Sequence, residues 1–193
     1  MTVETAASRA ELTTIALERP QRADARRNFD ALLEAGRAAF AENGSETSLE
    51  DVARRAGVGI GTLYRNFPTR EAFLEALYVE EIAGLVRVSD ESLALEPGEA
   101  FRAWINRFVE YAKNKRALLD GLNKESDTFK KCRVIMYGAG EPVLKRAQAA
   151  GEIRADADIT DVLFMVSGIA GVSFTDDAQR ERVLQLALDG LRP

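Results

Sequence analysis

Histidine is absent from this sequence of 193 residues, and cysteine occurs once, as Cys132. The lack of histidine removes catalytic triads, the usual general base near neutral pH and most transition-metal sites. One cysteine leaves no partner for an intrachain disulfide and excludes a cysteine-rich zinc site. Acidic stretches such as DITD and EIRADAD are typical of helix caps and loops, and no glycine-rich phosphate loop follows a strand. We therefore predict a protein that is not an enzyme and that needs no cofactor or metal ion.

Long apolar runs are missing as well. No segment approaches the roughly 18 to 20 apolar residues that span a bilayer, and the first residues lack the apolar stretch of a secretory signal. With 46% hydrophobic and 30% charged residues, the composition is that of a globular chain with one or two cores. These features predict a cytoplasmic protein without membrane contact.

An excess of positive charge is also lacking. The formal net charge is −5, and residues 22–79 carry eight arginines against nine acidic residues. None of the three parts 1–21, 22–79 and 80–193 is net basic, so any binding to nucleic acid must depend on where the charges lie and not on their sum.

What the sequence does contain is helical periodicity, which predicts an all-α fold. A first helix is expected over 24–42, ending at Asn43-Gly44. A second begins at the capping residue Ser48 and ends at Gly57, and a third, short helix runs from about Ile60 to Asn66. Helix, turn and short helix make a helix-turn-helix. Its small core should combine the first helix with Val52, Ala56, Val58, Leu63 and Phe67.

Three glycines crowd the start of the short helix. Glycine inside a helix costs about 1 kcal/mol relative to alanine, so their presence needs a reason. Gly59 is expected at the N-cap, where glycine is tolerated, and Gly61 removes bulk from the first turn. Bare backbone at a helix N-terminus can approach a groove and its phosphates closely, which favours a DNA-binding function.

The stretch TSLEDVARRAGVGIGTLYRNFPTREAFLEAL, residues 47–77, resembles the DNA-binding head of the tetracycline-repressor (TetR) family. The resemblance rests on the Ala-Gly-Val turn, the Thr-Leu-Tyr triplet, Phe67 and the acidic-aromatic start of the next helix, and it covers about residues 24–79. Farther along, AAGEIRADAD before an apolar helix is similar more loosely. Asn66 departs from the pattern, because the family often has histidine there.

The resemblance implies roles for eight residues of this head. Phosphate contacts fall to Ser48, Tyr64, Asn66 and Arg70, and contacts with base edges or the thymine methyl group fall to Ile60, Gly61, Thr62 and Arg65. Structural alternatives stay open for several of them. Tyr64 could belong to the core, Arg65 and Arg70 could be solvated charges, and Ser48 could be only a helix cap.

The rest of the chain is predicted to be a second helical unit, giving about nine helices in all. Helices are expected at 97–112, around 118–122, and at 127–137, 142–150, 159–174 and 178–191, with an interruption from Gly138 to Pro142. The domain organisation that follows is a flexible or partly helical arm at 1–21, a DNA-binding domain at 22–79 and a ligand-binding and dimerisation domain at 80–193.

The last two helices predict a homodimer. The helix at 159–174 is apolar on more than one face, and Gly168, Ala170 and Gly171 permit close helix approach. The resemblance implies a four-helix interface built from 159–174 and 178–191 of two chains. The alternative is that both helices only complete the core of a monomer.

Large apolar side chains in the second unit predict a pocket for a small-molecule effector. The candidates are Trp104, Phe108, Tyr111, Phe129, Met136, Tyr137, Phe164 and Met165, although most such residues simply fill cores. The function expected first is a dimeric repressor that a small molecule releases from a palindromic, double-stranded operator. Two alternatives are an effector-independent DNA-binding regulator under a protein partner's control and an all-helical enzyme.

Overall fold

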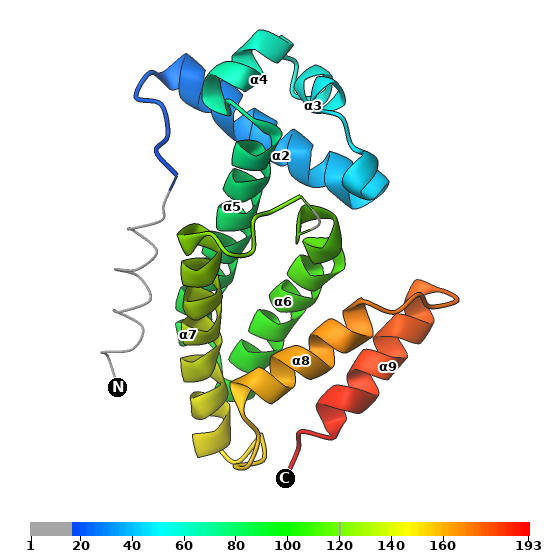
Figure 1. The fold of residues 1–193 in the computed structure, drawn as a ribbon. Coiled ribbons are helices and arrows are strands. Elements are labelled where there is room, and N and C mark those ends of the chain that lie inside the picture. The colour runs from blue at the N-terminus through cyan, green and yellow to red at the C-terminus, as the bar shows by residue number, and fades with distance from the viewer. Residues whose placement is uncertain (1–16, 120) are drawn as a thin grey trace. The chain divides into compact units, whose positions relative to one another are not determined.

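The computed structural model describes residues 17–119 and 121–193, without the side chains of 114–117 and 119. Most of the predicted arm at 1–21 therefore lies outside the described residues. The described part contains eight α-helices and two short 3-10 turns and no strand, which confirms the all-α prediction and comes close to its count (Figure 1). No helix within these ranges has both the length and the apolar character needed to cross a membrane.

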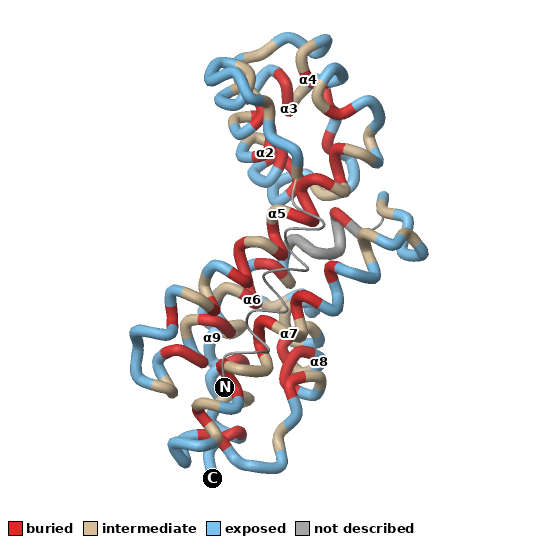
Figure 2. The backbone as a smooth tube through the Cα atoms, turned by 90° about the vertical axis from the view of Figure 1, so that its left-hand side faces the viewer, coloured by how far each residue is buried: buried red, intermediate tan, exposed pale blue. Residues whose placement is uncertain are grey.

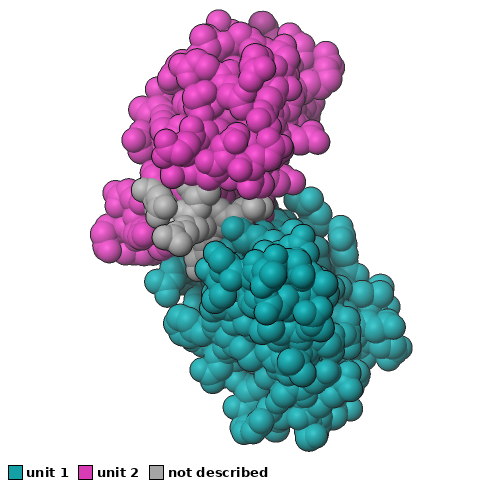
Figure 3. Space-filling view, turned by 90° about the vertical axis from the view of Figure 1, so that its right-hand side faces the viewer, with its two compact units in different colours: residues 1–14, 82–113, 133–193 teal, residues 15–81, 114–132 magenta. Residues whose placement is uncertain are grey.

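The chain forms two compact units, coloured separately in Figure 3. We call residues 17–81 together with 114–132 the head unit, and residues 82–113 together with 133–193 the bundle unit. The whole of the predicted DNA-binding domain, 22–79, lies within the head unit, and the structure groups 114–132 with it.

Four helices build the part of the head unit that matters for function. They are α2 (Ala23–Asn43), α3 (Leu49–Arg55), α4 (Ile60–Asn66) and the start of α5 (Arg70–Glu91), with the 3-10 turn η1 (Gly44–Glu46) after α2. The rings of Phe29 and Phe67 lie 4.9 Å apart and those of Phe67 and Phe73 lie 5.0 Å apart, so Phe67 joins α2 to α5. All three are buried. Figure 2 shows the buried residues of this unit as red segments along its helices.

Gly36 decides how closely α2 and α5 can approach. A Cβ atom at this buried glycine would lie 2.5 Å from Cζ of Phe73, which is closer than any real contact. The absence of a side chain therefore lets the Phe73 ring pack directly against the backbone of α2.

The bundle unit takes its helices from the later part of the chain. The 3-10 turn η2 (Ser92–Ala94) is followed by α6 (Pro97–Leu119), α7 (Asp127–Ala149), α8 (Ile159–Ala170) and α9 (Asp177–Asp189), of which α6 and α7 also contribute to the head unit. The predicted break after residue 112 is wrong, because α6 continues to Leu119. Its continuation places Leu118 in the core of the head unit, and this burial outweighs the charged stretch at 113–116 that interrupts the apolar pattern.

The predicted interruption from Gly138 to Pro142 is wrong as well, because α7 passes through it without a break. Proline inside a helix costs about 3 kcal/mol, since it cannot donate to the carbonyl four residues earlier. Contacts of α7 with α5 and with α6 oppose this cost. Ser89 Oγ on α5 donates to the Ala139 carbonyl oxygen at 2.8 Å, and a Cβ at Gly140 would lie 2.5 Å from the Trp104 ring.

Candidate nucleic-acid interface

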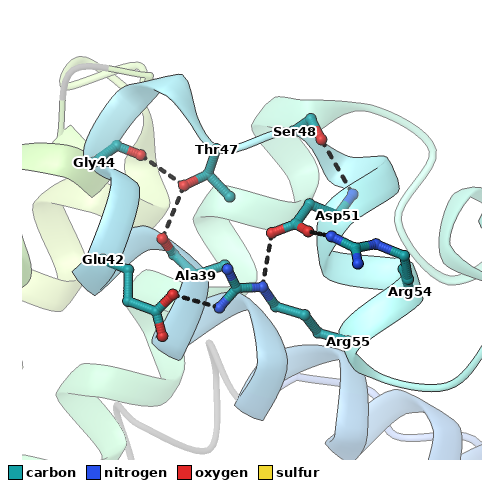
Figure 4. Close-up of polar contacts among 8 residues, drawn as sticks. All are labelled: Ala39, Glu42, Gly44, Thr47, Ser48, Asp51, Arg54 and Arg55. Atoms are coloured by element: carbon teal, nitrogen blue, oxygen red, sulfur yellow. Dashed lines mark hydrogen bonds and ion pairs between the residues drawn. The ribbon is translucent and has the colours of Figure 1, made fainter.

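The helix-turn-helix is formed by α3, the turn at 56–59 and α4. Ser48 caps α3, because its Oγ accepts a hydrogen bond from the Asp51 N–H at 3.1 Å (Figure 4). Gly57 has φ of 70°, the left-handed conformation that favours glycine, and its N–H donates to the Arg54 carbonyl at 3.1 Å. Gly59 is the extended N-cap of α4. Backbone geometry thus fixes the angle at which α4 leaves the turn.

The exposed face of α4 carries two large apolar side chains. Ile60 and Tyr64, one helical turn apart, are 37% and 44% exposed, and they are the exposed large hydrophobic residues of the described head unit. Leu63 on the inner face is fully buried. Gly61 and Arg65 are also exposed, while Thr62 and Asn66 are half-buried. An apolar and aromatic patch on a short, otherwise polar helix is typical of a surface that contacts a partner.

Space around the glycines of α4 is open. A Cβ atom at Gly59 or Gly61 would meet nothing within 4 Å, and neither residue has the positive φ that would demand glycine. Packing inside this chain therefore gives no reason for glycine at either position. An alanine at Gly61 would strengthen the helix, so the glycine leaves room for something outside the chain.

Asn66 and Arg70 have partners inside the protein. Asn66 Nδ2 donates to the Thr62 carbonyl one turn earlier in α4 at 2.8 Å. Arg70 donates to the backbone carbonyls of Thr47 at 2.6 Å and Ser45 at 2.8 Å. Its guanidinium also lies 5.3 Å from the centre of the Phe40 ring. The predicted phosphate contacts of both residues remain predictions, and each has a structural role beside them.

Thr47 is a structural residue that the sequence analysis did not single out. It is buried, and its Oγ1 donor lies 3.0 Å from the Ala39 carbonyl and 2.9 Å from the Gly44 carbonyl (Figure 4). Together with Arg70 it fixes the loop that leads into α3. The sequence shows a threonine directly before the capping residue Ser48, but this pattern does not indicate that the threonine side chain is buried.

Carboxylates of the head unit hold several of its arginines. Asp51 binds Arg54 and, at 2.7 Å, Arg55, which also reaches Glu42 at 2.7 Å (Figure 4). Desolvation opposes the ionisation of Asp51, but the hydrogen bonds from the two arginines outweigh it, so the pKa of this carboxyl falls below its usual value. These arginines are therefore partly neutralised before any partner arrives.

Three of the predicted effector-pocket residues form one aromatic row in the bundle unit. The rings of Trp104 and Phe108 lie 5.9 Å apart and those of Phe108 and Tyr111 lie 5.5 Å apart, and all three side chains are at most 1% exposed. Trp104 Nε1 donates to the Leu85 carbonyl of α5 at 3.2 Å. Met136 is buried, and Tyr137 and Met165 are half-buried.

Two other candidates do not join this row. Phe129 belongs to the head unit, where it stacks on Tyr78 with 5.2 Å between ring centres. Phe164 is 67% exposed on α8. Together with Val172 and Leu186, which are 54% and 72% exposed, it gives the α8–α9 segment three exposed apolar side chains.

Two surface clefts occur in the bundle unit. One, of about 400 Å³, is lined by residues near the start of α6, the loop after α7 and the end of the chain, including Arg102, Glu152 and Arg192. The other, of about 480 Å³, lies between α6 and α9 and includes Arg107 and Arg180. None of the eight predicted pocket residues lines either cleft. Within the described ranges, no three His, Cys, Asp or Glu residues gather as metal ligands would.

Comparison with known proteins gives matches over both parts of the chain. Residues 32–77 match the family described as bacterial regulatory proteins, tetR family, and residues 96–193 match the family described as transcriptional regulator SbtR-like, C-terminal domain. A TetR transcriptional regulator from Streptomyces coelicolor is similar at 45% identity, with 85% of this chain and 98% of that chain covered and a TM-score of 0.74.

Two further solved structures are similar over most of their length. A TetR regulatory protein from Mycobacterium vanbaalenii shares 32% identity, with 90% of this chain and 100% of that chain covered and a TM-score of 0.72. The fatty acid degradation regulator FadR from Bacillus halodurans shares 20% identity, with 85% and 100% covered and a TM-score of 0.53, a likeness that concerns the fold alone.

Proposed function

This chain belongs to the TetR family of DNA-binding transcriptional regulators, and we propose that it acts as a homodimer on an inverted-repeat operator from which a small molecule releases it. The observation that carries the proposal is the exposed face of α4, where Ile60, Tyr64 and Arg65 surround the bare backbone of Gly61. Regulators of this family are generally not enzymes, so the enzyme alternative loses its support.

On this proposal α4 is the recognition helix. Gly61 allows its first turn to lie close to the base edges, where Ile60, Thr62 and Arg65 make the contacts that distinguish sequences. Ser48, Tyr64 and Asn66 bind phosphates, and Arg70 does so with the guanidinium N–H groups that its two carbonyl partners leave available. Phosphate contacts set the register of the helix, and base contacts choose the site.

Dimerisation would follow from the exposed apolar side chains of α8 and α9. Phe164 and Leu186 are 67% and 72% exposed, and exposed apolar side chains gathered on one segment are typical of a surface that contacts a partner. The absence of a Cβ at Gly168, with nothing within 4 Å of that position, leaves room for a helix of a second chain. Two recognition helices related by a twofold axis would read half-sites about one helical turn apart.

Effector release is proposed to act through α5. The Leu85 carbonyl of this helix accepts the Trp104 indole N–H, so a ligand that displaces the Trp104 ring would break a buried contact with α5. Only a ligand that binds one of two conformations better can shift the population between them. A mainly apolar ligand would suit the aromatic row formed by Trp104, Phe108 and Tyr111, and its binding would require these packed rings to move apart.

The filled core favours a second candidate, a regulator without a small-molecule effector. The three rings of the aromatic row are at most 1% exposed, and neither surface cleft reaches them. In that case the signal would come from a protein partner.

A selection experiment tests the proposal. The purified full-length protein is used to select fragments from genomic DNA, and the enriched sites are checked by gel shift and by sedimentation of the protein alone. We expect an imperfect inverted repeat and a dimer at micromolar concentration. Absence of any selected sequence, or a monomer, would contradict the proposal. Addition of a metabolite mixture to the complex separates the two candidates, because only the first predicts release.

A further inference from the structure

Ion pairing divides the arginines at the start of the chain into two groups. Arg19 binds Asp30 and Glu80 at 2.9 Å each, and Arg37 binds Glu81 at 3.0 Å. Arg54 and Arg55 bind carboxylates of the head unit, and Arg70 binds carbonyls. Within the described part of the chain, no ion pair or side-chain hydrogen bond involves Arg22, Arg26, Arg27 or Arg65. Arg65 belongs to α4, whereas the other three cluster at the start of α2.

Two of these arginines continue the buried stripe of α2. Spacings of three, four, three and four residues place five positions on one face of α2, Arg26, Phe29, Leu33, Gly36 and Phe40, and the N-cap residue Arg22 lies four residues before Arg26 in the same register. The last four of these five positions are buried, but Arg22 and Arg26 are exposed because α2 begins ahead of the core. Arg27 lies about 160° around the helix from Phe29 at about 100° per residue, so it faces the other way.

The face that carries Arg22 and Arg26 points toward α4. Phe29, one turn after Arg26, packs against Phe67, the C-cap residue of α4, with 4.9 Å between ring centres. In Figure 1 the start of α2 lies beside α4 within the same unit. The two arginines therefore extend the surface formed by α4, next to its C-terminal end, where Arg65 is also exposed.

Helix stability does not account for these charges. The start of a helix is the positive end of its dipole, where cations are unfavourable and anions stabilise. Asp24 is the acidic residue of this first turn, and it forms no ion pair with the neighbouring arginines. The head thus keeps unneutralised guanidinium groups at a position that costs stability, although nine acidic residues lie between 22 and 79.

We propose that Arg22 and Arg26 form a second DNA contact, which binds backbone phosphates flanking the groove that α4 enters. A guanidinium group binds phosphate through two parallel hydrogen bonds, and such contacts position a protein without reading the sequence. This inference rests on the proposed DNA-binding role of α4. It explains how a protein of net charge −5 with a head that is not net basic presents a positive surface to DNA.

The test compares R22Q/R26Q with the matched variant R27Q. Arg27 is an exposed arginine on the same turn but on the opposite face. Fluorescence anisotropy with the selected operator is measured across a range of salt concentrations. For R22Q/R26Q we expect weaker binding and a salt slope shallower by about one per arginine and per bound head. The ranking of operator variants should stay unchanged, and R27Q should match the wild type.

Thermal unfolding shows whether a loss of DNA binding comes only from a loss of the fold. Removal of cations from the positive end of α2 should leave the melting temperature unchanged or slightly raised. The single variants R22Q and R26Q, each with about half the effect on the slope, keep the test valid if the double variant unfolds. A wild-type slope in R22Q/R26Q, an equal loss in R27Q or an altered ranking of operators would each overturn the inference. Failure of the wild type to bind any DNA would instead overturn the proposed function.

Discussion

Arg70, the first residue of α5, donates a hydrogen bond from Nη1 to the backbone carbonyl oxygen of Thr47 at 2.6 Å. Its other terminal nitrogen reaches the Ser45 carbonyl at 2.8 Å, and the guanidinium lies over the Phe40 ring. One side chain therefore connects α5 to the end of α2 and to the loop before α3. The residue that the family resemblance assigns to a phosphate also holds the head together.

Substitution of Arg70 by alanine should weaken the head and its DNA binding together. Loss of hydrogen bonds from a charged donor to part-buried carbonyls should lower the free energy of unfolding by about 1 to 3 kcal/mol. Arg70→Lys keeps the charge but cannot bond both carbonyls in the same fork, so it should recover affinity more than stability. Chemical denaturation and anisotropy measure the two effects, and an unchanged stability of R70A would contradict the structural role.

Gly61→Ala should separate stability from function. Since a Cβ there meets nothing within 4 Å, the substitution should raise the stability of α4 by up to about 1 kcal/mol through helix propensity alone. The same methyl group would stand between the helix and the bases, so operator affinity should fall. Denaturation and gel shift on the same preparation give both values. Equal or better binding by G61A would show that the first turn of α4 does not approach the groove.

Gly36→Ala should have the opposite effect on stability. Its Cβ would lie 2.5 Å from Cζ and 2.9 Å from Cε1 of Phe73, so the ring or the helix must move. Overpacking of this kind costs about 1 to 3 kcal/mol, more than the gain from replacing glycine in a helix. A lower denaturation midpoint is expected, and the double variant G36A/F73L should recover part of it by making room. A midpoint at or above that of the wild type would show that α2 and α5 can separate freely.

The sequence allowed α2, α3 and α4 to be predicted because their ends are set by local chemistry. Ser48 accepts the Asp51 N–H, Gly57 adopts a positive φ, and Gly44 ends α2, each as its residue type indicates. The continuity of α7 could not be predicted in this way. Ser89 and Trp104 pack against α7 at Ala139 and Gly140, just before Pro142, but they are distant from α7 in sequence and become its neighbours only in the fold.

Apolar periodicity has a similar limit for the proposed sites. It predicts which side chains are buried, but not which of them meet, so Trp104 and Phe108 stack while Phe129 lies in the other unit. The sequence likewise does not show which arginines are paired with carboxylates. Their number is visible in the sequence, but the separation of Arg22 and Arg26 from paired residues such as Arg37 requires the positions of the carboxylates.

The pH dependence of stability should be flat near neutrality and steep in acid. No histidine is present to titrate between about pH 5 and 8. Asp158 caps α8 and its carboxylate accepts the Thr160 N–H, which lowers its pKa below the usual 3.8. A folded pKa below the unfolded one stabilises the protein above the unfolded value, and this contribution disappears as pH falls through the folded value.

Melting temperatures of the wild type and D158N, measured from pH 2.5 to pH 8, check this expectation. The difference between the two proteins should be constant from pH 6 to 8 and should shrink below about pH 4 as the wild-type carboxylate becomes protonated. A difference that grows toward acid would contradict the cap as its source. A change in the melting temperature of the wild type near pH 6.5 would contradict the expectation that its stability is constant near neutral pH.

Charge placed on the α8–α9 segment should dissociate the proposed dimer. Phe164→Glu and Leu186→Glu put carboxylates at side chains that are 67% and 72% exposed, so neither should disturb the fold of the single chain. Burying such a charge against a second chain without a partner is costly, and sedimentation should show a monomer. Operator affinity should fall steeply, because each half-site must then bind on its own.

Leu93→Glu is the matched control for these substitutions. Leu93 is 52% exposed in the bundle unit but belongs to η2, outside α8 and α9, so this variant should remain dimeric and bind the operator as the wild type does. Dissociation of all three variants would indicate a general effect of added charge. A dimer that survives both F164E and L186E would place the interface elsewhere, and the exposed apolar side chains of α8 and α9 would then need a different partner to cover them.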